Sequence, residues 1–209
     1  MKGRLVAFEG IDRAGKSTAV RNVSAALDDC LVAVTSCSER DSPLGPLLEP
    51  SKLPRLSPFL KAYLFAADRA WTYEKKAQVA LAAGHLVFWD RYVDSAYAYR
   101  GAERALGRSD LNPAIVRALN APFVRPDLVV YIDIMVDVSS ERGRNGQLQE
   151  AYDVPFLEEV RRQYDSLAKA ECYCRIDGSG TCSQVADAVA AVVRSAFPDL
   201  FPCLLSSRT

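Results

Sequence analysis

The stretch RLVAFEGIDRAGKST, residues 4–18, decides the fold class of this chain. A short apolar run leads into Gly10, and residues 10–17 match the pattern G-x-x-x-x-G-K-[ST]. The glycines let the loop wrap so that successive backbone N–H groups converge on phosphate oxygens. The helix expected to follow would point its positive end at the same anion. This order of strand, loop and helix predicts a nucleoside triphosphate site.

Single residues of this loop carry separate expectations. Lys16 would reach the β- and γ-phosphates, and the Ser17 hydroxyl would coordinate Mg²⁺. Arg13 is unusual, because such loops hold anions mainly with backbone N–H groups and one lysine. Its place in the loop predicts a contact where charge develops during phosphoryl transfer. The ATP-binding residues expected here are Gly10, Asp12, Arg13, Ala14, Gly15, Lys16, Ser17 and Thr18.

Composition limits the classes of partner. The 209 residues include 26 basic and 26 acidic side chains, and the isoelectric point is about 6.6. This balance argues against a general binder of nucleic acid or membrane surfaces, which would carry a basic excess. No stretch approaches the roughly 18–20 apolar residues of a membrane helix. Six cysteines in so long a chain predict no disulfide scaffold, and the C-x-C pair Cys172 and Cys174 has no assignable role. We expect a cytoplasmic protein.

Apolar runs alternate with longer helical patterns along the chain, which predicts an α/β fold with a five-stranded parallel sheet flanked by helices. Strands are expected at 4–9, 31–36, 85–90, 127–134 and 172–177. Helices are expected at 17–28, 58–83, 93–106, 113–120, 136–142, 153–170 and 182–196. The proline-rich segment 42–58 indicates a loop or a broken helix. We expect residues 1–209 to form a single domain.

Further polar motifs follow the expected strands. DRY (90–92) lies at the carboxyl end of the third strand, where open α/β sheets bind ligands. There Arg91 could bridge two phosphates and Asp90 could orient a Mg²⁺-bound water. Arg40 in SER (38–40) follows the second strand on the same rim. Phe65 and Arg69 share one helix face at i, i+4, so they could stack on a base and bond its carbonyl, although core packing is the simpler role for the ring.

Together these motifs resemble the thymidylate kinase family of nucleoside monophosphate kinases. The resemblance rests on FEGIDRAGKST (8–18), SER (38–40), LFAADR (64–69), DRY (90–92), PDLVVYIDI (126–134) and RGRNGQLQEAYD (142–153). Members transfer the γ-phosphoryl group of ATP to dTMP with Mg²⁺, giving dTDP and ADP on the route to dTTP. The resemblance implies a P-loop kinase fold with a short lid, and a homodimer formed through the long helices.

The resemblance also implies roles for single residues. Catalysis would depend on Arg13, Lys16, Asp90 and Arg91, and Mg²⁺ would be held by Ser17 and, through water, Asp90. The dTMP site would consist of Asp12, Arg40, Phe65, Arg69, Arg91, Tyr99 and Tyr152. In it Phe65 would stack on thymine, Arg69 would bond its O4, and Tyr99 would pack along the thymidine. Tyr152 would crowd the sugar 2′ position. Arg142 would contact ATP near the loop that follows residue 177.

The segment 139–153 contains glycines, polar residues and arginines, which is typical of a lid that closes over phosphates and excludes water. Relatives carry a catalytic arginine either in the phosphate loop or in the lid. Arg13 places this chain in the first group. Because Arg142 and Arg144 are also present in the lid, the role of Arg144 stays open.

Other functions remain open from the sequence. A deoxynucleoside kinase has a similar loop and a D/E-R-x motif, and Glu39 could be taken for its base, but its uncharged acceptor has less need of Arg40. Adenylate or guanylate kinase is a closer relative. A non-catalytic nucleotide-binding module would leave Asp90 and Arg91 unexplained. Tolerance for dUMP is also open, because one methyl group changes discrimination by only about 1–3 kcal/mol.

Overall fold

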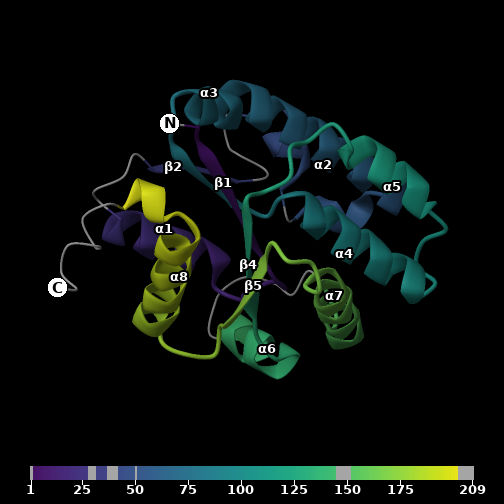
Figure 1. Cartoon of the computed structure of the whole chain (residues 1–209). Coiled ribbons are helices and arrows are strands. Elements are labelled where there is room, and N and C mark those ends of the chain that lie inside the picture. The colour runs from purple at the N-terminus through teal and green to yellow at the C-terminus, as the bar shows by residue number, and fades with distance from the viewer. Residues whose placement is uncertain (1, 28–31, 37–41, 50, 145–151, 202–209) are drawn as a thin grey trace.

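A computed structural model describes residues 2–27, 32–36, 42–49, 51–144 and 152–201 (Figure 1). Its strands are β1 (Arg4–Glu9), β2 (Val32–Ser36), β3 (Leu86–Asp90), β4 (Leu128–Asp133) and β5 (Tyr173–Asp177). Its α-helices are α1 (Lys16–Ala26), α2 (Pro58–Thr72), α3 (Gln78–Ala82), α4 (Val93–Ala105), α5 (Pro113–Asn120), α6 (Val136–Arg144), α7 (Val154–Leu167) and α8 (Cys182–Ala196). Shorter helical turns are η1 (Gly45–Leu47), η2 (Leu53–Arg55), η3 (Tyr73–Ala77) and η4 (Pro198–Leu200).

Over the described ranges, all five strands form one parallel sheet in the order β2-β3-β1-β4-β5. The chain leaves the central strand β1 toward β2 and β3 on one side, and later crosses to β4 and β5 on the other. The connections therefore diverge at the carboxyl end of β1, where sheets of this kind bind ligands. The predicted α/β fold and parallel sheet are confirmed.

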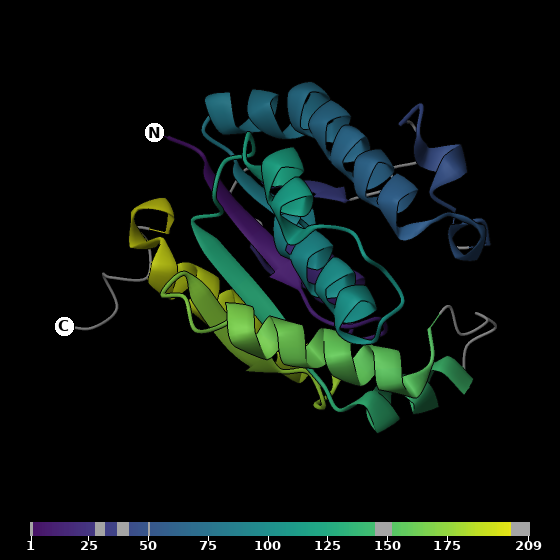
Figure 2. The ribbon, with the colours of Figure 1, turned by 90° about the vertical axis from the view of Figure 1, so that its right-hand side faces the viewer.

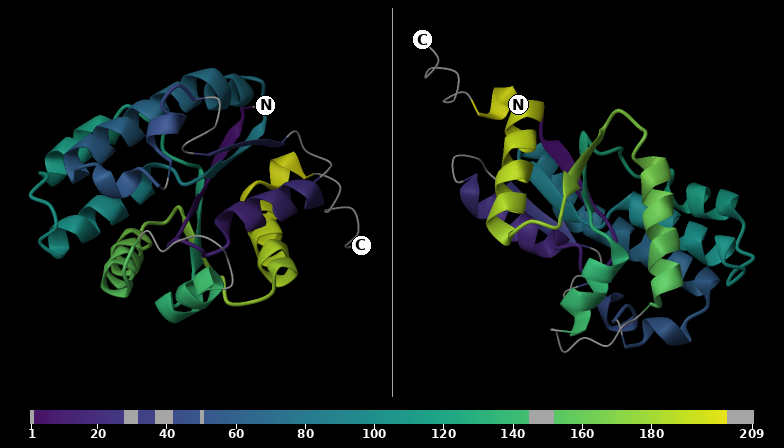
Figure 3. Two further views of the ribbon diagram at one scale, coloured as in Figure 1. Left: turned by 180° about the vertical axis from the view of Figure 1, so that it is seen from behind. Right: turned by 90° about the horizontal axis from the view of Figure 1, so that it is seen from below.

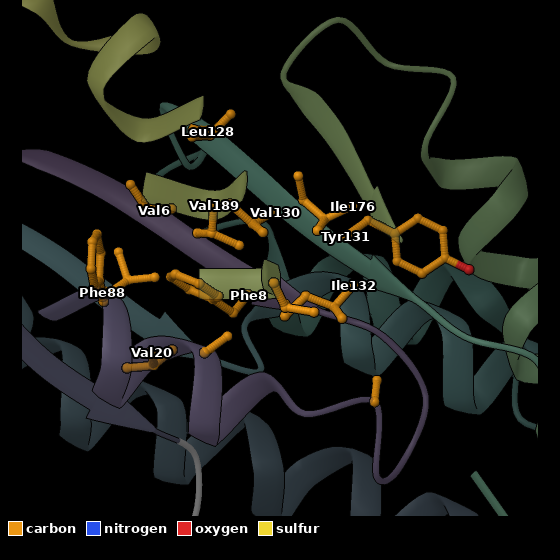
Figure 4. Close-up of a cluster of buried hydrophobic side chains, with 14 of the residues drawn as sticks. Val6, Phe8, Val20, Phe88, Leu128, Val130, Tyr131, Ile132, Ile176 and Val189 are labelled. Carbon is orange, nitrogen blue, oxygen red and sulfur yellow. The ribbon is translucent and has the colours of Figure 1, made fainter. Parts of the chain in front are cut away.

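Both faces of β1 are buried, which explains its continuous apolar sequence. Val6 and Phe8 point into a cluster with Val20 of α1 and Val189 of α8 (Figure 4). Leu5 and Ala7 alternate with them and belong to a second cluster with Val87 and Trp89 of β3. Within the first cluster the rings of Phe8 and Phe88 meet edge to face, with centroids 5.2 Å apart.

Helices form a layer on each side of the sheet. Figure 1 shows α1 and α8 on one face and α2 to α5 with α7 on the other. Figure 2 shows α4 and α7 side by side across the second face, in agreement with their packing. Figure 3 shows the same layers from behind and from below, with α6 beyond the carboxyl end of β4. The phosphate loop follows β1 and so leaves the sheet at its carboxyl edge, the same edge at which α6 follows β4.

Side chains cap several helices where the sequence indicates a start. Ser57 accepts a hydrogen bond from Leu60 N at 3.1 Å and Pro58 opens α2, as expected from the fixed φ of proline. Asp153 accepts from Phe156 N at 2.9 Å at the start of α7. These local signals explain why the predicted helices agree closely with the observed ones.

Three segments add detail to the expectations. The helix predicted over 58–83 contains a π-helical turn, η3, between α2 and α3. The proline-rich segment forms the 3₁₀ turns η1 and η2, in each of which a proline is one of the first residues. Helix α6 ends two residues beyond the helix predicted over 136–142, so the first part of the segment predicted as a lid is helical. Residues 145–151 of that segment lie outside the described part, and the single-domain organisation of 1–209 stays a prediction. No helix in the described ranges is long and apolar enough to cross a membrane.

Candidate active site

The phosphate loop joins β1 to α1 through an unusual backbone. Gly10 and Gly15 have φ of 145° and 97°, and Arg13 has a φ of 60°. A Cβ atom on Gly10 would lie 2.4 Å from the carbonyl oxygen of Ile132, so a side chain does not fit there. Gly15 is the N-cap of α1, and no side chain caps this helix. The positive end of α1 is therefore open to an anion.

Lys16 lies beneath this loop and is 4% exposed. Its ammonium group donates to the carbonyl oxygens of Gly10 at 3.0 Å and Ile11 at 2.7 Å. Burial, and then repulsion from Arg91, lower the pKa of Lys16 to about 8. A bound phosphate would oppose both effects, so the lysine is placed to be fully charged when the site holds an anion.

The two predicted metal-site residues, Ser17 and Asp90, lie in direct contact. The Ser17 hydroxyl donates to Asp90 Oδ2 at 2.5 Å, and Asp90 Oδ1 is buried without a hydrogen-bond partner among the described residues. An oxygen left without a donor beside a second oxygen is suited to a cation or to its bound water. No group of three or more carboxylate, histidine or cysteine ligands exists in the described ranges. This donor set fits Mg²⁺, which keeps several waters and substrate phosphates as ligands.

Arg91 lies at the centre of the site with a φ of 63°. Its guanidinium forms an ion pair with Asp12 and donates to Tyr99 Oη at 3.1 Å, with the Tyr99 ring centroid 5.3 Å away. Burial alone would raise the pKa of Asp12, but Arg91 and then Lys16 reverse this and lower it. Asp12 is therefore a carboxylate that orients Arg91 beside the phosphate loop.

Phe65 and Arg69 line the same cavity from α2. Arg69 is 1% exposed, donating to Asn120 Oδ1 at 2.6 Å and to the Tyr92 carbonyl at 3.1 Å. Its guanidinium also lies over the Phe123 ring, 5.5 Å from the centroid. Arg69 Nε is buried and has no acceptor among the described residues. A buried donor of this kind is costly unless a ligand supplies an acceptor.

One cavity of about 750 Å³ connects these groups. Its wall includes the phosphate loop, Arg91 and Phe65, and Gly178 and Cys182 lie near the start of α8. Leu48 and Leu53 of the proline-rich segment also line it. This segment is therefore part of the wall, and the volume suits a small-molecule site.

Aromatic side chains close the side of the cavity next to α7. Tyr152 stacks on Phe156 with centroids 4.5 Å apart and meets Tyr99 edge to face at 5.6 Å. Tyr99 and Tyr152 both line the cavity. The structure thus brings these two sequence-predicted tyrosines together.

Helix α6 is tied to the phosphate loop. Arg142 donates to the carbonyl oxygens of Arg13 at 3.1 Å and Gly178 at 2.8 Å, so it joins the loop to the segment after β5. The Arg13 guanidinium packs against Gly143, where an added Cβ would lie 2.1 Å from Arg13 Nη1. Arg13 thus reaches across to α6 instead of extending into solvent.

A family model for thymidylate kinase matches residues 8–189 of the chain. The chain belongs to the thymidylate kinase family. It is 37% identical over 198 residues to a "Probable thymidylate kinase" of Natronomonas pharaonis, covering 91% of this chain and 97% of that protein. It is 34% identical over 190 residues to a "Thymidylate kinase" of Caldanaerobacter subterraneus, covering 85% and 88%. A "Probable thymidylate kinase" of Pyrobaculum calidifontis is 32% identical over 198 residues, covering 93% and 98%.

Membership of this family confirms the predicted kinase, an enzyme that uses ATP as phosphoryl donor. All the predicted site residues that the structure describes, except Gly10 and Asp90, line one cavity. Asp90 is hydrogen-bonded to Ser17, which does line it. Arg40 and Glu39 lie outside the described residues, as does the side chain of Arg144.

Glu9 holds the turn that follows β3 in this thymidylate kinase family member, a role that was not predicted from the sequence. It is fully buried and accepts from the backbone N–H groups of Tyr92 at 2.9 Å and Ser95 at 3.3 Å. The hydroxyls of Ser95 and Tyr164 donate to it at 2.6 and 2.9 Å. Burial, and then the nearby Asp94, raise the pKa of Glu9. The sequence does contain one sign of this role, because Glu9 places a carboxylate at the end of the apolar run of β1.

The Glu9 contacts hold the turn from which Arg91 projects. We predict that Glu9→Ala lowers the free energy of unfolding by about 3 kcal/mol, because two buried N–H groups lose their acceptor. It should also lower kcat for phosphoryl transfer about tenfold or more, because Arg91 loses its orientation. Urea denaturation and steady-state kinetics measure the two effects.

Glu9→Gln is the matched control for this prediction. Its amide oxygen can accept from both N–H groups while the two hydroxyls rotate to accept from its nitrogen. It should recover most of the stability and most of kcat. Wild-type kcat in folded Glu9→Ala would contradict the positioning of Arg91 by Glu9.

Proposed function

We propose that this thymidylate kinase family member transfers the γ-phosphoryl group of ATP to dTMP with Mg²⁺, giving dTDP and ADP for dTTP synthesis. The observation that supports this most directly is the single cavity that joins the phosphate loop to Phe65 and Arg69 across Arg91. Phosphoryl transfer requires two anions in line and cancellation of their charge, with little covalent chemistry from the protein. A cavity with a central buried arginine fits that requirement.

The donor half would hold ATP by the phosphate loop and the positive end of α1. The proposed ATP-binding residues are Gly10, Asp12, Arg13, Ala14, Gly15, Lys16, Ser17, Thr18 and Arg142. Lys16 would contact the β- and γ-phosphates from below the loop. Arg142 lies between the loop and Gly178, so it would meet the adenine side of ATP.

Ser17 and Asp90 would hold Mg²⁺, Ser17 directly and Asp90 through water. The open Asp90 Oδ1 supports this assignment. The ion would neutralise charge on the β- and γ-phosphates. The hydrogen bond between the two side chains holds them next to each other before the ion binds.

The acceptor half would hold dTMP. Arg91 and Arg40 would bind its phosphate, and Asp12 would orient Arg91 and approach the sugar 3′-hydroxyl. Phe65 would stack on thymine, while Arg69 Nε would donate to O4 and so gain the acceptor that it lacks. Tyr99 and Tyr152 would pack along the deoxyribose, where Tyr152 would exclude a 2′-hydroxyl.

A panel of acceptors tests this function. With Mg²⁺ and ATP, we expect dTMP to give the highest kcat/KM among dTMP, dUMP, dCMP, dGMP, AMP and thymidine. Loss of the methyl contact should make dUMP about 10–200-fold poorer. dCMP should be poorer still, because its amino group would face the Arg69 donor. Turnover of thymidine without turnover of dTMP would instead indicate a deoxynucleoside kinase.

Arg13, Lys16, Asp90 and Arg91 would supply catalysis, with Arg13 at the transferred phosphoryl group. We predict that Arg13→Ala lowers kcat about 10³-fold with little change in the KM for dTMP, because the contact strengthens only as charge develops. Steady-state kinetics measure both parameters. Arg162→Ala, whose side chain is 73% exposed on α7, is the matched control and should retain wild-type rates. A pure KM effect of Arg13→Ala would contradict the assignment.

We also propose that the enzyme is a cytoplasmic homodimer joined through α2. The exposed face of this helix carries Phe59, Leu60 and Tyr63, which are 53%, 44% and 42% exposed. The Phe59 and Tyr63 rings pack together at 4.7 Å, which forms a contiguous apolar surface suited to a second copy.

This assembly is testable by sedimentation. We predict that the wild-type chain is a dimer and that Tyr63→Glu is a monomer, because a two-fold interface would bring two buried charges together. Val124→Glu, at a 42% exposed residue outside α2, is the control and should stay dimeric. A monomeric wild-type protein would overturn the proposal.

A further inference from the structure

Three charged side chains are buried next to the acceptor half of the cavity. Lys61 of α2 is 8% exposed, and Arg100 and Glu103 of α4 are 7% and 4% exposed. Side chains of these types are rarely buried unless they are paired. Nothing in the donor, metal or phosphate sites described above uses them.

The three side chains form a cluster of two cations and one carboxylate. Arg100 Nε lies 3.1 Å from Glu103 Oε2, and Lys61 Nζ lies 3.5 Å from Glu103 Oε1. Arg100 Nη1 also donates weakly to the Pro58 carbonyl at 3.5 Å. Two cations share one carboxylate, so the cluster holds a net positive charge. Most N–H groups of Arg100 have no acceptor among the described residues.

The two cations face the cavity. Lys61 and Arg100 line it, whereas Glu103 is not among the described residues of its wall. Removing such charges from water is costly, and pairing alone often does not offset that cost. Buried donors at the wall of a binding cavity are therefore expected to meet acceptor atoms of a ligand.

The position of Lys61 along α2 indicates which part of the ligand Lys61 and Arg100 meet. Lys61 lies one turn before Phe65, and Arg69 lies one turn after it, so all three lie on one face of the helix. A pyrimidine stacked on Phe65 with O4 toward Arg69 would direct the N1–C2 side of its ring toward Lys61 and Arg100. C2 carries the second carbonyl oxygen, O2, next to the nitrogen that bears the sugar.

We propose that Arg100, oriented by Glu103 and supported by Lys61, donates a hydrogen bond to the O2 carbonyl of the acceptor pyrimidine. Each of the two carbonyl oxygens of the base is then bound by one guanidinium, O4 by Arg69 and O2 by Arg100. This inference rests on the proposed thymidylate kinase function. It adds a specificity-determining residue, and it explains why a net positive cluster is buried at this wall.

Thio-substituted acceptors test the contact atom by atom, since sulfur is a weak hydrogen-bond acceptor. In the wild-type enzyme, replacing dTMP by 2-thio-dTMP should raise KM about tenfold or more, with little change in kcat. In Arg100→Met, the KM for dTMP should rise by a similar factor, and 2-thio-dTMP should bring no further loss. The penalty for 4-thio-dTMP should be the same in both enzymes, because Arg69 is intact.

Controls separate this contact from a structural role. Arg104→Met, at an exposed position of the same helix, should behave as wild type with all three acceptors. Glu103→Gln keeps the shape of the cluster and should both raise the KM for dTMP and reduce the 2-thio penalty. If Arg100→Met failed to fold, the measurements on the wild-type enzyme and on Glu103→Gln would still test the proposal.

Two results would overturn the inference. One is a wild-type enzyme that uses dTMP and 2-thio-dTMP equally well. The other is a folded Arg100→Met enzyme that retains the full 2-thio penalty. Failure of the proposed function is distinguishable from both, because the wild-type enzyme would then not phosphorylate dTMP at all.

Discussion

Parallel pairing of β1 with β3 is the interaction on which the rest of the site depends. It sets Phe8 opposite Asp90, and the Arg91 N–H donates to the Phe8 carbonyl at 3.0 Å. The phosphate loop and the DRY turn therefore leave the sheet side by side. Ser17 can then reach Asp90, and Arg91 can reach Asp12, across sequence separations of 73 and 79 residues. The proposed donor and acceptor halves share one cavity because these two strands are neighbours.

The need to pair buried charged side chains is the second constraint. In this site each of three buried cations has a fixed hydrogen-bonding partner. Lys16 is held by loop carbonyls, Arg91 by Asp12, and Arg69 by Asn120. Charges oriented in advance require no reorganisation when a phosphoryl group moves, which is how electrostatic catalysis gains its advantage over water. Two buried groups without a hydrogen-bond partner among the described residues, Asp90 Oδ1 and Arg69 Nε, lie where a cation and a base carbonyl are proposed.

Local patterns were sufficient to predict most elements of the fold. β4 is buried on both faces, so its sequence is a continuous apolar run with clear limits. Pro58 marks the start of α2 because its fixed φ suits the first helical position. The π-helical turn η3 and the helical extension of α6 were not predicted, because neither has a distinctive residue pattern and both depend on neighbouring packing.

The sequence by itself determined the phosphate loop and its chemistry, because G-x-x-x-x-G-K-[ST] between a strand and a helix requires only local backbone geometry. It also placed Phe65 and Arg69 on one helix face, since helical period is a local property. Only the tertiary structure decided which groups Glu9 and Arg100 meet. Glu9 bonds donors 83 and 86 residues away, and Arg100 meets the cavity beside a lysine from another helix. A buried charge acquires its function from partners brought by the fold, and residue type alone does not identify those partners.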